Sequence, residues 1–264
     1  MIDWNKRLQI AETAAKKAGH YLIEALPRKR EISKKGVVDL VTEADRYAEK
    51  LIHEIIKGAF PDDRFLAEEG TRTESMSELI WLVDPLDGTI NYAHRFPVFC
   101  VSIALAEKGR SKIGCIYNPN LDECFTAQSD RGAYLNGERI HVSATAELLD
   151  SLLATGFPYD VRESNSDNMS NFITFYKRGA QAVRRAGSAA LDLAYTACGR
   201  FDGFWELKLN PWDIGAGVLL VAEAGGRVTD FSGGPVDLFR GEVLASNGII
   251  HEKMQKVLKE AAGL

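Results

Sequence analysis

The chain has 264 residues, of which 45% are hydrophobic and 26% charged, and 32 Lys and Arg against 37 Asp and Glu give a formal net charge of -5. These ordinary values exclude a disordered, collagen-like or coiled-coil protein, and the length suffices for a substantial core in one large domain or two lobes. The weak negative charge does not attract nucleic acid or an anionic membrane. Arg28–Arg30 and Arg184–Arg185 are local basic spots, which we interpret as solvated surface.

Cysteine usage and the polar amino-terminal residues indicate the cellular compartment. Cys100, Cys115, Cys124 and Cys198 lie far apart without a C-x-x-C spacing, which argues against a disulfide framework or a thiolate metal site. No apolar stretch approaches the ~18 residues that are needed to span a bilayer, and no export signal is visible. We therefore expect a cytoplasmic protein with reduced thiols and no membrane partner.

The amino-terminal region has the pattern of two amphipathic helices. Apolar residues recur at intervals of three and four from Trp4 to Leu26, and Pro27 ends this stripe. A second helix is predicted after Thr42, which can act as its N-cap, and it ends before Pro61. Its predicted buried face consists of Tyr47, Ala48, Leu51, Ile52, Ile55 and Ile56.

Strands are predicted in the middle of the chain. Residues 79–83, Leu-Ile-Trp-Leu-Val, predict a buried strand that leads directly into Asp84–Thr89. Between Phe96 and Val142, short alternating runs are separated by turn sequences such as Asn136-Gly137, which together predict an antiparallel meander. We therefore expect residues 1–142 to form an α+β half.

Residues 143–264 show strands and helices in alternation, which is typical of an α/β half. Ser188 is the predicted N-cap of a helix over residues 189–198. A second helix is predicted over residues 214–224 and is introduced by Pro211-Trp212-Asp213. Because no repeat or low-complexity linker separates the two halves, we expect them to be tightly packed.

Carboxylates gather at four places along the chain: Asp45, Glu68-Glu69, Asp84 with Asp87, and Asp213. Each has an ordinary structural explanation, because Asp and Glu are common at exposed turns and helix starts. Asp45 can complete a capping box with Thr42, Glu68-Glu69 can be a solvated loop, and Asp213 can interact with a helix dipole.

The loop at residues 84–89 is harder to explain by structure alone. Asp84 follows a buried strand, a proline stiffens the exit, Asp87 comes three residues later, and Gly88 lets the backbone approach a ligand closely. Two carboxylates and the Leu86 carbonyl are hard oxygen donors that suit Mg²⁺ or Mn²⁺. The amides after Gly88 can begin a short helix that faces an anion such as phosphate. The loop therefore predicts a metal next to a phosphate.

Electrostatics favours the same interpretation if the fold gathers these acids. Two unit charges ~4 Å apart repel by ~4 kcal/mol at an effective dielectric constant of about 20. Carboxylates in one cleft then have raised pKa values unless cations are present. A site with several metal ions would relieve this repulsion.

The chain resembles the inositol monophosphatase family through five signatures in the family's order, and residues 184–188 and 199–206 look most like its bacterial branch. They are Asp39–Asp45, Phe65–Glu69, Trp81–Tyr92, Gly187–Ala190, and Pro211–Gly217 followed by Glu223–Gly226. The resemblance covers nearly the whole chain. It implies a layered αβαβα fold of the sugar-phosphatase type, with the metal site between the two halves. Residues 1–142 then carry most metal ligands, and residues 143–264 carry Asp213 and the contacts to substrate hydroxyls.

The resemblance also implies roles for individual residues. The expected ligands of two or three Mg²⁺ ions, for which Mn²⁺ can substitute, are Glu68, Asp84, the Leu86 carbonyl, Asp87 and Asp213. Asp45 and Thr89 match the pair that orients the attacking water, and the water is deprotonated with help from this pair or from an ion bound to Glu68. Contacts to the phosphate or the substrate hydroxyls are expected at Gly88, Thr89, Gly187, Ser188, Ala189, Glu206 and Asp213. Lys34–Val38 resembles the family's loop near a third metal, with an ordinary exposed loop as the alternative.

The activity implied by the resemblance is Mg²⁺-dependent hydrolysis of a phosphate monoester by metal-activated water, without a covalent intermediate. Inositol 1-phosphate is the first expected substrate. Fructose 1,6-bisphosphate, alone or together with inositol 1-phosphate, and the 3′-phosphate of a nucleotide are alternatives in the same reaction class. A non-enzymatic alternative is a protein that binds RNA or the transcription machinery, which the complete set of acids disfavours as the sole role. The family further implies a homodimer and inhibition by Li⁺.

Other catalytic motifs leave weak signals. Gly215-Ala216-Gly217 begins like a dinucleotide-binding fingerprint, but position 220 is Leu and no strand leads directly into it. We therefore interpret these glycines as helix-packing residues. No P-loop lysine motif and no G-x-S-x-G sequence is present, and the five histidines lack zinc spacing.

Overall fold

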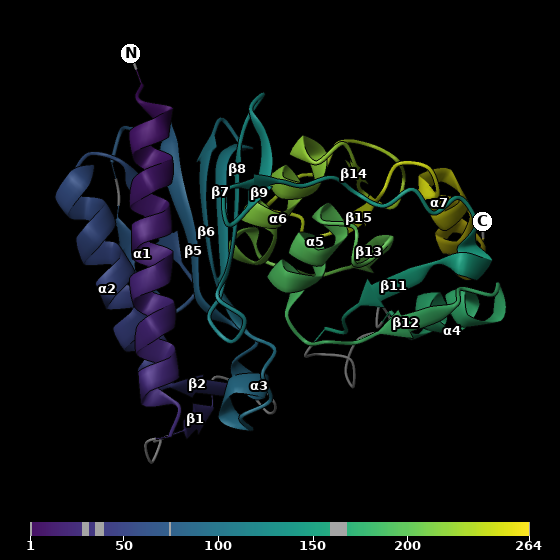
Figure 1. Ribbon diagram of the computed structural model, residues 1–264, viewed down its shortest axis with the longest axis horizontal. Helices are drawn as coiled ribbons and strands as arrows, with labels where there is room; N and C mark the ends of the chain where they lie inside the picture. The colour runs from purple at the N-terminus through teal and green to yellow at the C-terminus, as the bar shows by residue number, and fades with distance from the viewer. Residues whose placement is uncertain (1, 28–31, 35–39, 74, 159–167, 264) are drawn as a thin grey trace.

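The computed structural model describes residues 2–27, 32–34, 40–73, 75–158 and 168–263 (Figure 1). The predicted basic spot at residues 28–30, and the predicted loop over residues 34–38 apart from its first residue, lie outside these ranges. Helices and sheets alternate in layers from one side of the molecule to the other (Figure 1). The order is a helical layer, an eight-stranded sheet, a second helical layer, a five-stranded sheet and a third helical layer. This is the αβαβα arrangement that was predicted.

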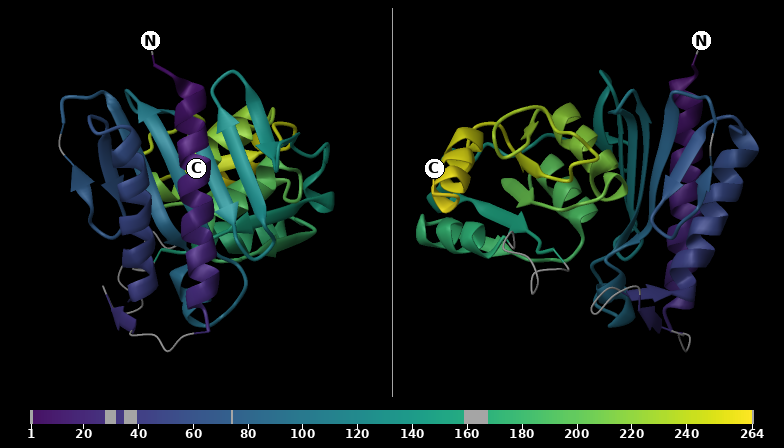
Figure 2. Two further views of the ribbon diagram at one scale, coloured as in Figure 1. Left: turned by 60° about the vertical axis from the view of Figure 1, so that its left-hand side comes forward. Right: turned by 180° about the vertical axis from the view of Figure 1, so that it is seen from behind.

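The first helical layer consists of α1 (Trp4–Ala25) and α2 (Glu43–Ala59), which lie across one face of the eight-stranded sheet (Figure 2). Both match the predicted helices to within about two residues. The predicted buried face of α2 is confirmed at Ala48, Ile52 and Ile56, whereas Leu51 and Ile55 are only partly buried. Contrary to the prediction, Tyr47 is 50% exposed, and its ring packs on Tyr21 with 4.3 Å between ring centroids. Between the helices, β1 (Ile32–Lys34) and β2 (Leu40–Thr42) form a short antiparallel pair.

The eight-stranded sheet has the order β10-β9-β8-β7-β6-β5-β3-β4. Its strands are β3 (Arg64–Ala67), β4 (Arg72–Thr73), β5 (Leu79–Asp87), β6 (Cys100–Glu107), β7 (Arg110–Asn118), β8 (Glu123–Gln128), β9 (Gly132–Leu135) and β10 (Glu138–Arg139). Strands β5 to β10 form a continuous antiparallel meander, which confirms the prediction for that region. Strand β3 pairs parallel with β5, so the carboxyl ends of these two strands lie at the same edge. Helix α3 (Thr89–Ala93) follows β5 directly.

The five-stranded sheet has the order β12-β11-β13-β15-β14. Its strands are β11 (Leu152–Thr155), β12 (Ala182–Arg184), β13 (Gly203–Glu206), β14 (Arg227–Thr229) and β15 (Val243–Ser246). Helices α5 (Ala189–Ala197) and α6 (Pro211–Glu223) cover one face, and α4 (Met169–Lys177) and α7 (His251–Ala261) cover the other (Figures 1 and 2). A 3₁₀ turn (Leu148–Asp150) precedes β11. Ser188 caps α5 as predicted, but α6 begins at Pro211, because proline is well suited to the first helical position.

Helix α6 joins the two sheets. A Cβ atom at Gly217 would lie 2.5 Å from Leu193 on α5, and one at Gly215 would lie 3.1 Å from Ala104 on β6. The prediction that these glycines serve helix packing is therefore confirmed. At the far end of α6, the Glu223 carboxylate accepts hydrogen bonds over 2.7–3.1 Å from the backbone N–H groups of Asp130 and Arg131, in the turn after β8, and of Gly132, which begins β9. The division of the chain into halves at residues 142 and 143 stays a prediction. Helix α6, from the second half, packs directly on a strand of the first half.

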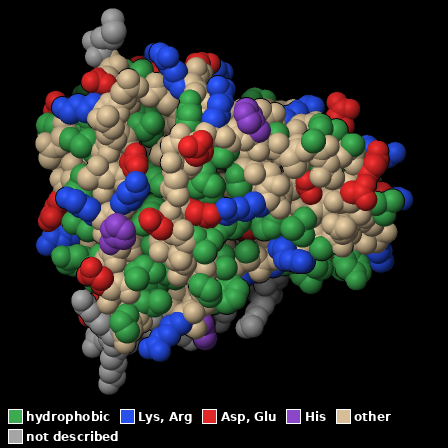
Figure 3. Space-filling view, in the orientation of Figure 1, with side chains coloured by type: hydrophobic (Ala, Val, Ile, Leu, Met, Phe, Trp, Pro, Cys, Tyr) green, Lys and Arg blue, Asp and Glu red, His purple; other side chains and the backbone are tan. Residues whose placement is uncertain are grey.

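The cysteines and the surface charges agree with what the composition led us to expect. All four cysteines are free thiols. On the face shown in Figure 3, acidic and basic side chains are interspersed and hydrophobic side chains lie between them. Within the described ranges, no helix combines the length and the apolar character that crossing a lipid bilayer requires.

Candidate active site

The end of β5 contains a β-bulge that determines where two acids point. Asp84 pairs with Ser102 and Asp87 pairs with Cys100, so β5 has one more residue than β6 in this interval. Residues three apart on a regular strand face opposite sides of the sheet, and an extra residue re-aims the next side chain. Asp84 and Asp87 therefore face the same side. Pro85 fits the bulge because it has no backbone N–H to donate, and the Leu86 N–H donates to Asp84 Oδ1 over 2.9 Å.

Asp87 is held by the amino-terminal end of α5, which belongs to the other half of the chain. Its Oδ2 accepts a hydrogen bond from Ser188 Oγ over 2.6 Å and one from the Ala190 backbone N–H over 2.8 Å. The same Ser188 hydroxyl accepts the Leu191 N–H as the helix N-cap. This cap therefore also fixes one acid of the site. The signature at residues 187–190 marks this contact.

Asp213 and Glu68 come from two further segments. Asp213 is the third residue of α6, and its Oδ2 accepts the Asn210 N–H over 2.6 Å, which is half of a capping box. The helix-start interpretation of Asp213 is thus correct, and its side chain also lines the pocket. Glu68 follows β3, the parallel neighbour of β5, and is partly buried, so it does not lie in a fully solvated loop.

Thr89, which lines the pocket, forms a pair with Asp45, which does not line it. Both side chains are buried, and Thr89 Oγ1 lies 3.1 Å from Asp45 Oδ1 and 3.0 Å from the Leu86 carbonyl oxygen. Asp45 is on α2, whereas Thr89 is the first residue of α3. The preceding Gly88 has φ of 93°, and a Cβ atom there would lie 2.8 Å from the Val98 carbonyl oxygen, so only glycine fits this position.

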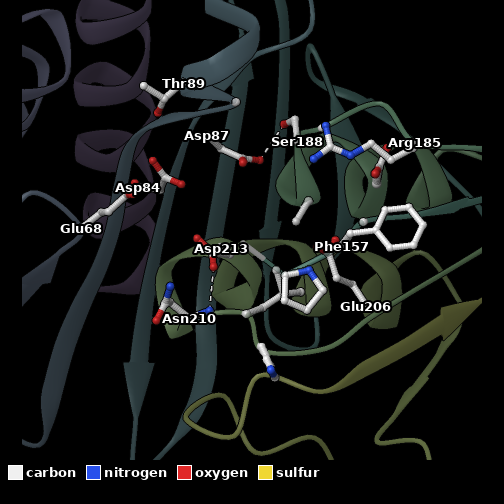
Figure 4. Close-up of a pocket in the computed structure, with 18 of the residues that line it drawn as sticks. Glu68, Asp84, Asp87, Thr89, Phe157, Arg185, Ser188, Glu206, Asn210 and Asp213 are labelled. Carbon is white, nitrogen blue, oxygen red and sulfur yellow. Dashed lines mark hydrogen bonds between the residues drawn. The ribbon is translucent and has the colours of Figure 1, made fainter. Parts of the chain in front are cut away.

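One pocket gathers nearly every residue that was predicted for the site (Figure 4). Its lining includes Glu68, Asp84, Leu86, Asp87, Gly88, Thr89, Gly187, Ser188, Ala189, Glu206 and Asp213. Asp45 reaches it through Thr89. In Figure 4 the carboxyl groups of Asp84, Asp87 and Asp213 face a common space, and Glu206, Phe157 and Arg185 lie on the opposite side. The pocket thus has an acidic end and a mixed end.

Burial and mutual repulsion raise the pKa values of the acids in this pocket. The pKa of Asp84 lies well above its usual range because Asp84 is buried and because Glu68, Asp87 and Asp213 are close. Burial raises the pKa of Asp87 to about 6, although the hydrogen bonds from Ser188 and Ala190 oppose the shift. Burial and the charge of Asp87 raise the pKa of Asp213. Without a cation, these carboxyl groups therefore bind protons more readily than ordinary acids do.

The mixed end contains residues that the sequence did not reveal. Asp192 on α5 is 1% exposed, and its Oδ1 has no hydrogen-bond partner among the described residues. Arg185 and Lys208 also line the pocket, so the basic spot at residues 184–185 is more than solvated surface. Asp192 is the one acid in the otherwise largely apolar helix Ala189–Ala197, and an acid in such a buried stripe is the sequence signal that could have found it.

Glu206 is held at the mixed end by close packing. It is 8% exposed, and burial, together with the charge of Asp87, raises its pKa to about 8. A Cβ atom at Gly156, the residue after β11, would lie only 2.1 Å from Glu206 Oε1, so this glycine leaves just enough room for the carboxyl group. The arrangement suits a residue that exchanges hydrogen bonds with neutral hydroxyl groups.

The donor set fits a hard divalent cation. Carboxylates and a backbone carbonyl are the ligands that Mg²⁺ and Mn²⁺ prefer, and the acids at this end repel one another without a cation. Within the described part of the chain, however, no three carboxyl, imidazole or thiol groups converge tightly enough to form a ready-made metal site. The acids thus line one wall of the pocket without forming a closed cluster among the described residues.

Comparison with known proteins identifies the class. Residues 3–262 match the model of the inositol monophosphatase family. An inositol-1-monophosphatase of Synechocystis sp. is 46% identical over 258 residues, which cover 97% of this chain and 90% of that protein. A fructose-1,6-bisphosphatase/inositol-1-monophosphatase of Thermotoga maritima is 40% identical and covers 96% of each chain. The structure of an inositol monophosphatase from Anabaena (Nostoc) sp. superimposes with a TM-score of 0.89 at 44% identity, covering 97% of this chain and 96% of that one.

The chain therefore belongs to the inositol monophosphatase family. In terms of reaction class it is a phosphoric monoester hydrolase. The resemblance that the five signatures indicated and the fold that it implied are both confirmed.

Proposed function

We propose that this protein is a Mg²⁺-dependent phosphatase that hydrolyses inositol 1-phosphate to inositol and phosphate. The observation that carries the proposal is the convergence of Glu68, Asp84, Asp87 and Asp213, from three distant segments, on one pocket. The family match supports a phosphate monoester as the substrate. The Synechocystis relative, by its name, supports inositol 1-phosphate.

Glu68, Asp84, the Leu86 carbonyl, Asp87 and Asp213 are the residues that would hold Mg²⁺, or Mn²⁺ in its place, as two or three ions. When bound, such ions lower the pKa of water and stabilise negative charge on phosphate and on a leaving oxygen. The protein's contribution is to place several acids at one end of a pocket whose other end receives the organic part of the substrate. The hydrogen bonds from Ser188 and Ala190 to Asp87 fix the position of this acid relative to α5.

We assign the handling of the proton of the attacking water to Thr89 and Asp45. The Thr89 hydroxyl can accept a hydrogen bond from water while it donates its own proton to Asp45 Oδ1, 3.1 Å away. Asp45 is buried, so the Thr89 hydroxyl lies between it and the pocket. The backbone at Gly88 and Thr89, at the start of α3, is the proposed contact for phosphate oxygens.

At the mixed end, we assign Glu206, Ser188, Gly187 and Ala189 to the hydroxyl groups of the substrate. Glu206 can donate a hydrogen bond when protonated and accept one when ionised, and its pKa of about 8 makes both forms accessible near neutral pH. We assign Asp213, at the acidic end, to the metal and also to an adjacent substrate hydroxyl group. This distribution favours a polyol phosphate over a simple alkyl phosphate.

A sugar bisphosphate is a second candidate substrate. Arg185 and Lys208 line the mixed end, where they can attract a second anionic group. The Thermotoga maritima relative is named for both activities. We further expect a cytoplasmic homodimer that Li⁺ inhibits, on the strength of the family resemblance. The 3′-phosphate of a nucleotide and an RNA- or transcription-related role remain predictions from the sequence.

The test is a phosphate-release assay with inositol 1-phosphate, fructose 1,6-bisphosphate and phosphoadenosine phosphate, with and without Mg²⁺. We expect Mg²⁺-dependent release that is fastest with inositol 1-phosphate. Asp87→Asn should abolish turnover, whereas Asp150→Asn, at an exposed position, should not. A folded Asp87→Asn protein that releases phosphate at near-normal rates at saturating Mg²⁺ would refute the assignment of the site.

A further inference from the structure

Glu49 is a buried acid that does not line the pocket but contacts the segment that carries Glu68. It lies on α2 and is 3% exposed. Its Oε2 accepts the backbone N–H of Glu69 over 2.7 Å, and its Oε1 accepts the backbone N–H of Thr71 over 2.9 Å. One carboxylate thus satisfies two backbone donors on the residues that follow Glu68.

These two hydrogen bonds close a tight turn. The Ala67 N–H donates to the Thr71 carbonyl oxygen over 3.0 Å, and Gly70 has φ of 104°, a conformation that favours glycine. The Glu68 N–H donates to the Val83 carbonyl oxygen on β5 over 3.1 Å. Glu68 is therefore fixed on one side by β5 and on the other by Glu49.

The face of α2 that carries Glu49 also carries Asp45, the hydrogen-bond partner of Thr89. Asp45, Glu49 and His53 are spaced four residues apart, so they lie along one side of the helix. The His53 ring packs edge-on against Phe65 of β3, with 4.9 Å between ring centroids. Helix α2 thus fixes the position of β3 and its turn relative to Asp45, which bonds Thr89.

We propose that Glu49 is a positioning residue that holds Glu68 in place for metal binding and ties its position to that of Asp45. The inference rests on the proposed function, in which Glu68 is a metal ligand. Replacing the carboxylate leaves at least one partly buried N–H group without its acceptor, and the turn relaxes to regain a hydrogen bond. Loss of an outer partner of a metal ligand typically weakens metal binding 10–100-fold.

The experiment compares the full-length protein with Glu49→Gln and with the control Glu54→Gln. Glu54 is on the same helix, and its side chain is exposed and lies 3.9 Å from Lys50. Mn²⁺ and Mg²⁺ binding is measured by titration calorimetry without substrate. We expect Glu49→Gln to weaken binding about tenfold or more, and Glu54→Gln to match the wild type. The Mg²⁺ concentration for half-maximal activity should rise in Glu49→Gln while kcat at saturating Mg²⁺ changes little.

Hydrogen exchange of the metal-free proteins provides a readout that does not depend on any metal. The amides of Glu69 and Thr71 should exchange at least tenfold faster in Glu49→Gln, and those of the β6–β7 pair should not change. If Glu49→Gln does not fold, Glu49→Asp, which keeps the charge but shortens the reach, is measured in the same way. A variant of Glu49 that binds metal and protects both amides like the wild type would overturn the inference. A wild-type protein that binds no Mg²⁺ would instead overturn the proposed function, and the exchange data would still show whether Glu49 holds the turn.

Discussion

Thr89 Oγ1 lies 3.1 Å from Asp45 Oδ1 and 3.0 Å from the Leu86 carbonyl oxygen, and its single proton can be given to only one of them at a time. If Asp45 accepts it during turnover, Asp45→Asn should lower kcat by about 10²–10⁴-fold, the usual contribution of acid–base catalysis. Thr89→Ala should have a similar effect, and the double variant should be little worse than either single variant.

The control for this pair is Thr89→Ser, which keeps the hydroxyl group and should retain most of the activity. Mg²⁺ binding by calorimetry should be close to that of the wild type in Asp45→Asn, because Asp45 is not among the assigned ligands. Additive losses from Asp45→Asn and Thr89→Ala would show that the two residues act separately.

Asp84→Asn should affect the metal-free and the metal-bound protein in opposite directions. Asp84 is 2% exposed, and burial and the charges of Glu68, Asp87 and Asp213 raise its pKa. Removing its charge relieves this repulsion, and an asparagine oxygen can still accept the Leu86 N–H. We expect Tm of the metal-free protein at pH 8 to rise by about 2–4 °C, which corresponds to roughly 1 kcal/mol.

The stabilisation that Mg²⁺ gives to the wild type should be lost in Asp84→Asn. Both effects can be measured in one calorimetric series with and without Mg²⁺. If Mg²⁺ raises Tm of the variant as much as that of the wild type, Asp84 is not a ligand.

Gly156→Ala tests the mixed end of the pocket without touching the acidic end. The added Cβ atom would lie 2.1 Å from Glu206 Oε1, so the Glu206 carboxyl group must move. We expect kcat/KM for inositol 1-phosphate to fall by about tenfold or more, since displacing one substrate hydrogen bond costs about 1–3 kcal/mol. Hydrolysis of p-nitrophenyl phosphate, which lacks the polyol, should change much less.

The matched control for Gly156→Ala is Gly58→Ala on α2. A Cβ atom at Gly58 would meet no atom within 4 Å, and alanine in a helix stabilises by about 0.5–1 kcal/mol relative to glycine. Gly58→Ala should therefore raise Tm and leave both substrates unaffected. Equal losses for both substrates in Gly156→Ala would mean that Gly156 does not act through Glu206.

Glu206 should make the stability of the metal-free protein depend on pH. Burial raises its pKa in the folded protein from 4.5 to about 8, so between these values the folded state holds a proton that the unfolded state has lost. The free energy of unfolding then falls as pH rises from about 4.5 to about 8. In Glu206→Gln this contribution is absent, so the variant should be more stable than the wild type at pH 8 and lose that advantage toward pH 5. Denaturant unfolding at both values measures it, and parallel pH profiles would contradict the prediction.

Local sequence patterns predicted the positions of helices and strands better than the burial of single side chains or the first residue of a helix. The stripe at residues 4–26, the buried run at residues 79–83 and the Ser188 cap gave helices and strands close to those observed. Tyr47 has helical spacing for the core but is half exposed, because periodicity does not reveal that a neighbouring helix offers Tyr21 as a partner. The start of α6 was placed three residues late because Pro211 was interpreted as a residue outside the helix.

The candidate site was predictable only through the resemblance to a family. Nothing in the spacing of Glu68 and Asp213 shows that they share a pocket, because their proximity depends on how the two sheets pack. The bulge at Pro85 could be suspected from the proline, but its effect on the direction of Asp87 requires the register with β6. Glu49 carries no local signal, since acids on amphipathic helices are usually solvated. Asp192, in contrast, could have been suspected, because it lies in a largely apolar helix.

Helix α6 carries a functional or structural contact at each end. Asp213, near its start, lines the pocket, and Glu223, its last residue, accepts hydrogen bonds from the chain between β8 and β9. A helix turns by about 100° for each residue, so inserting or deleting one residue between these points would swing one acid away from its partners. The number of residues from Asp213 to Glu223 should thus be fixed in any working version of this protein, and evolutionary change in length is expected in the loops instead.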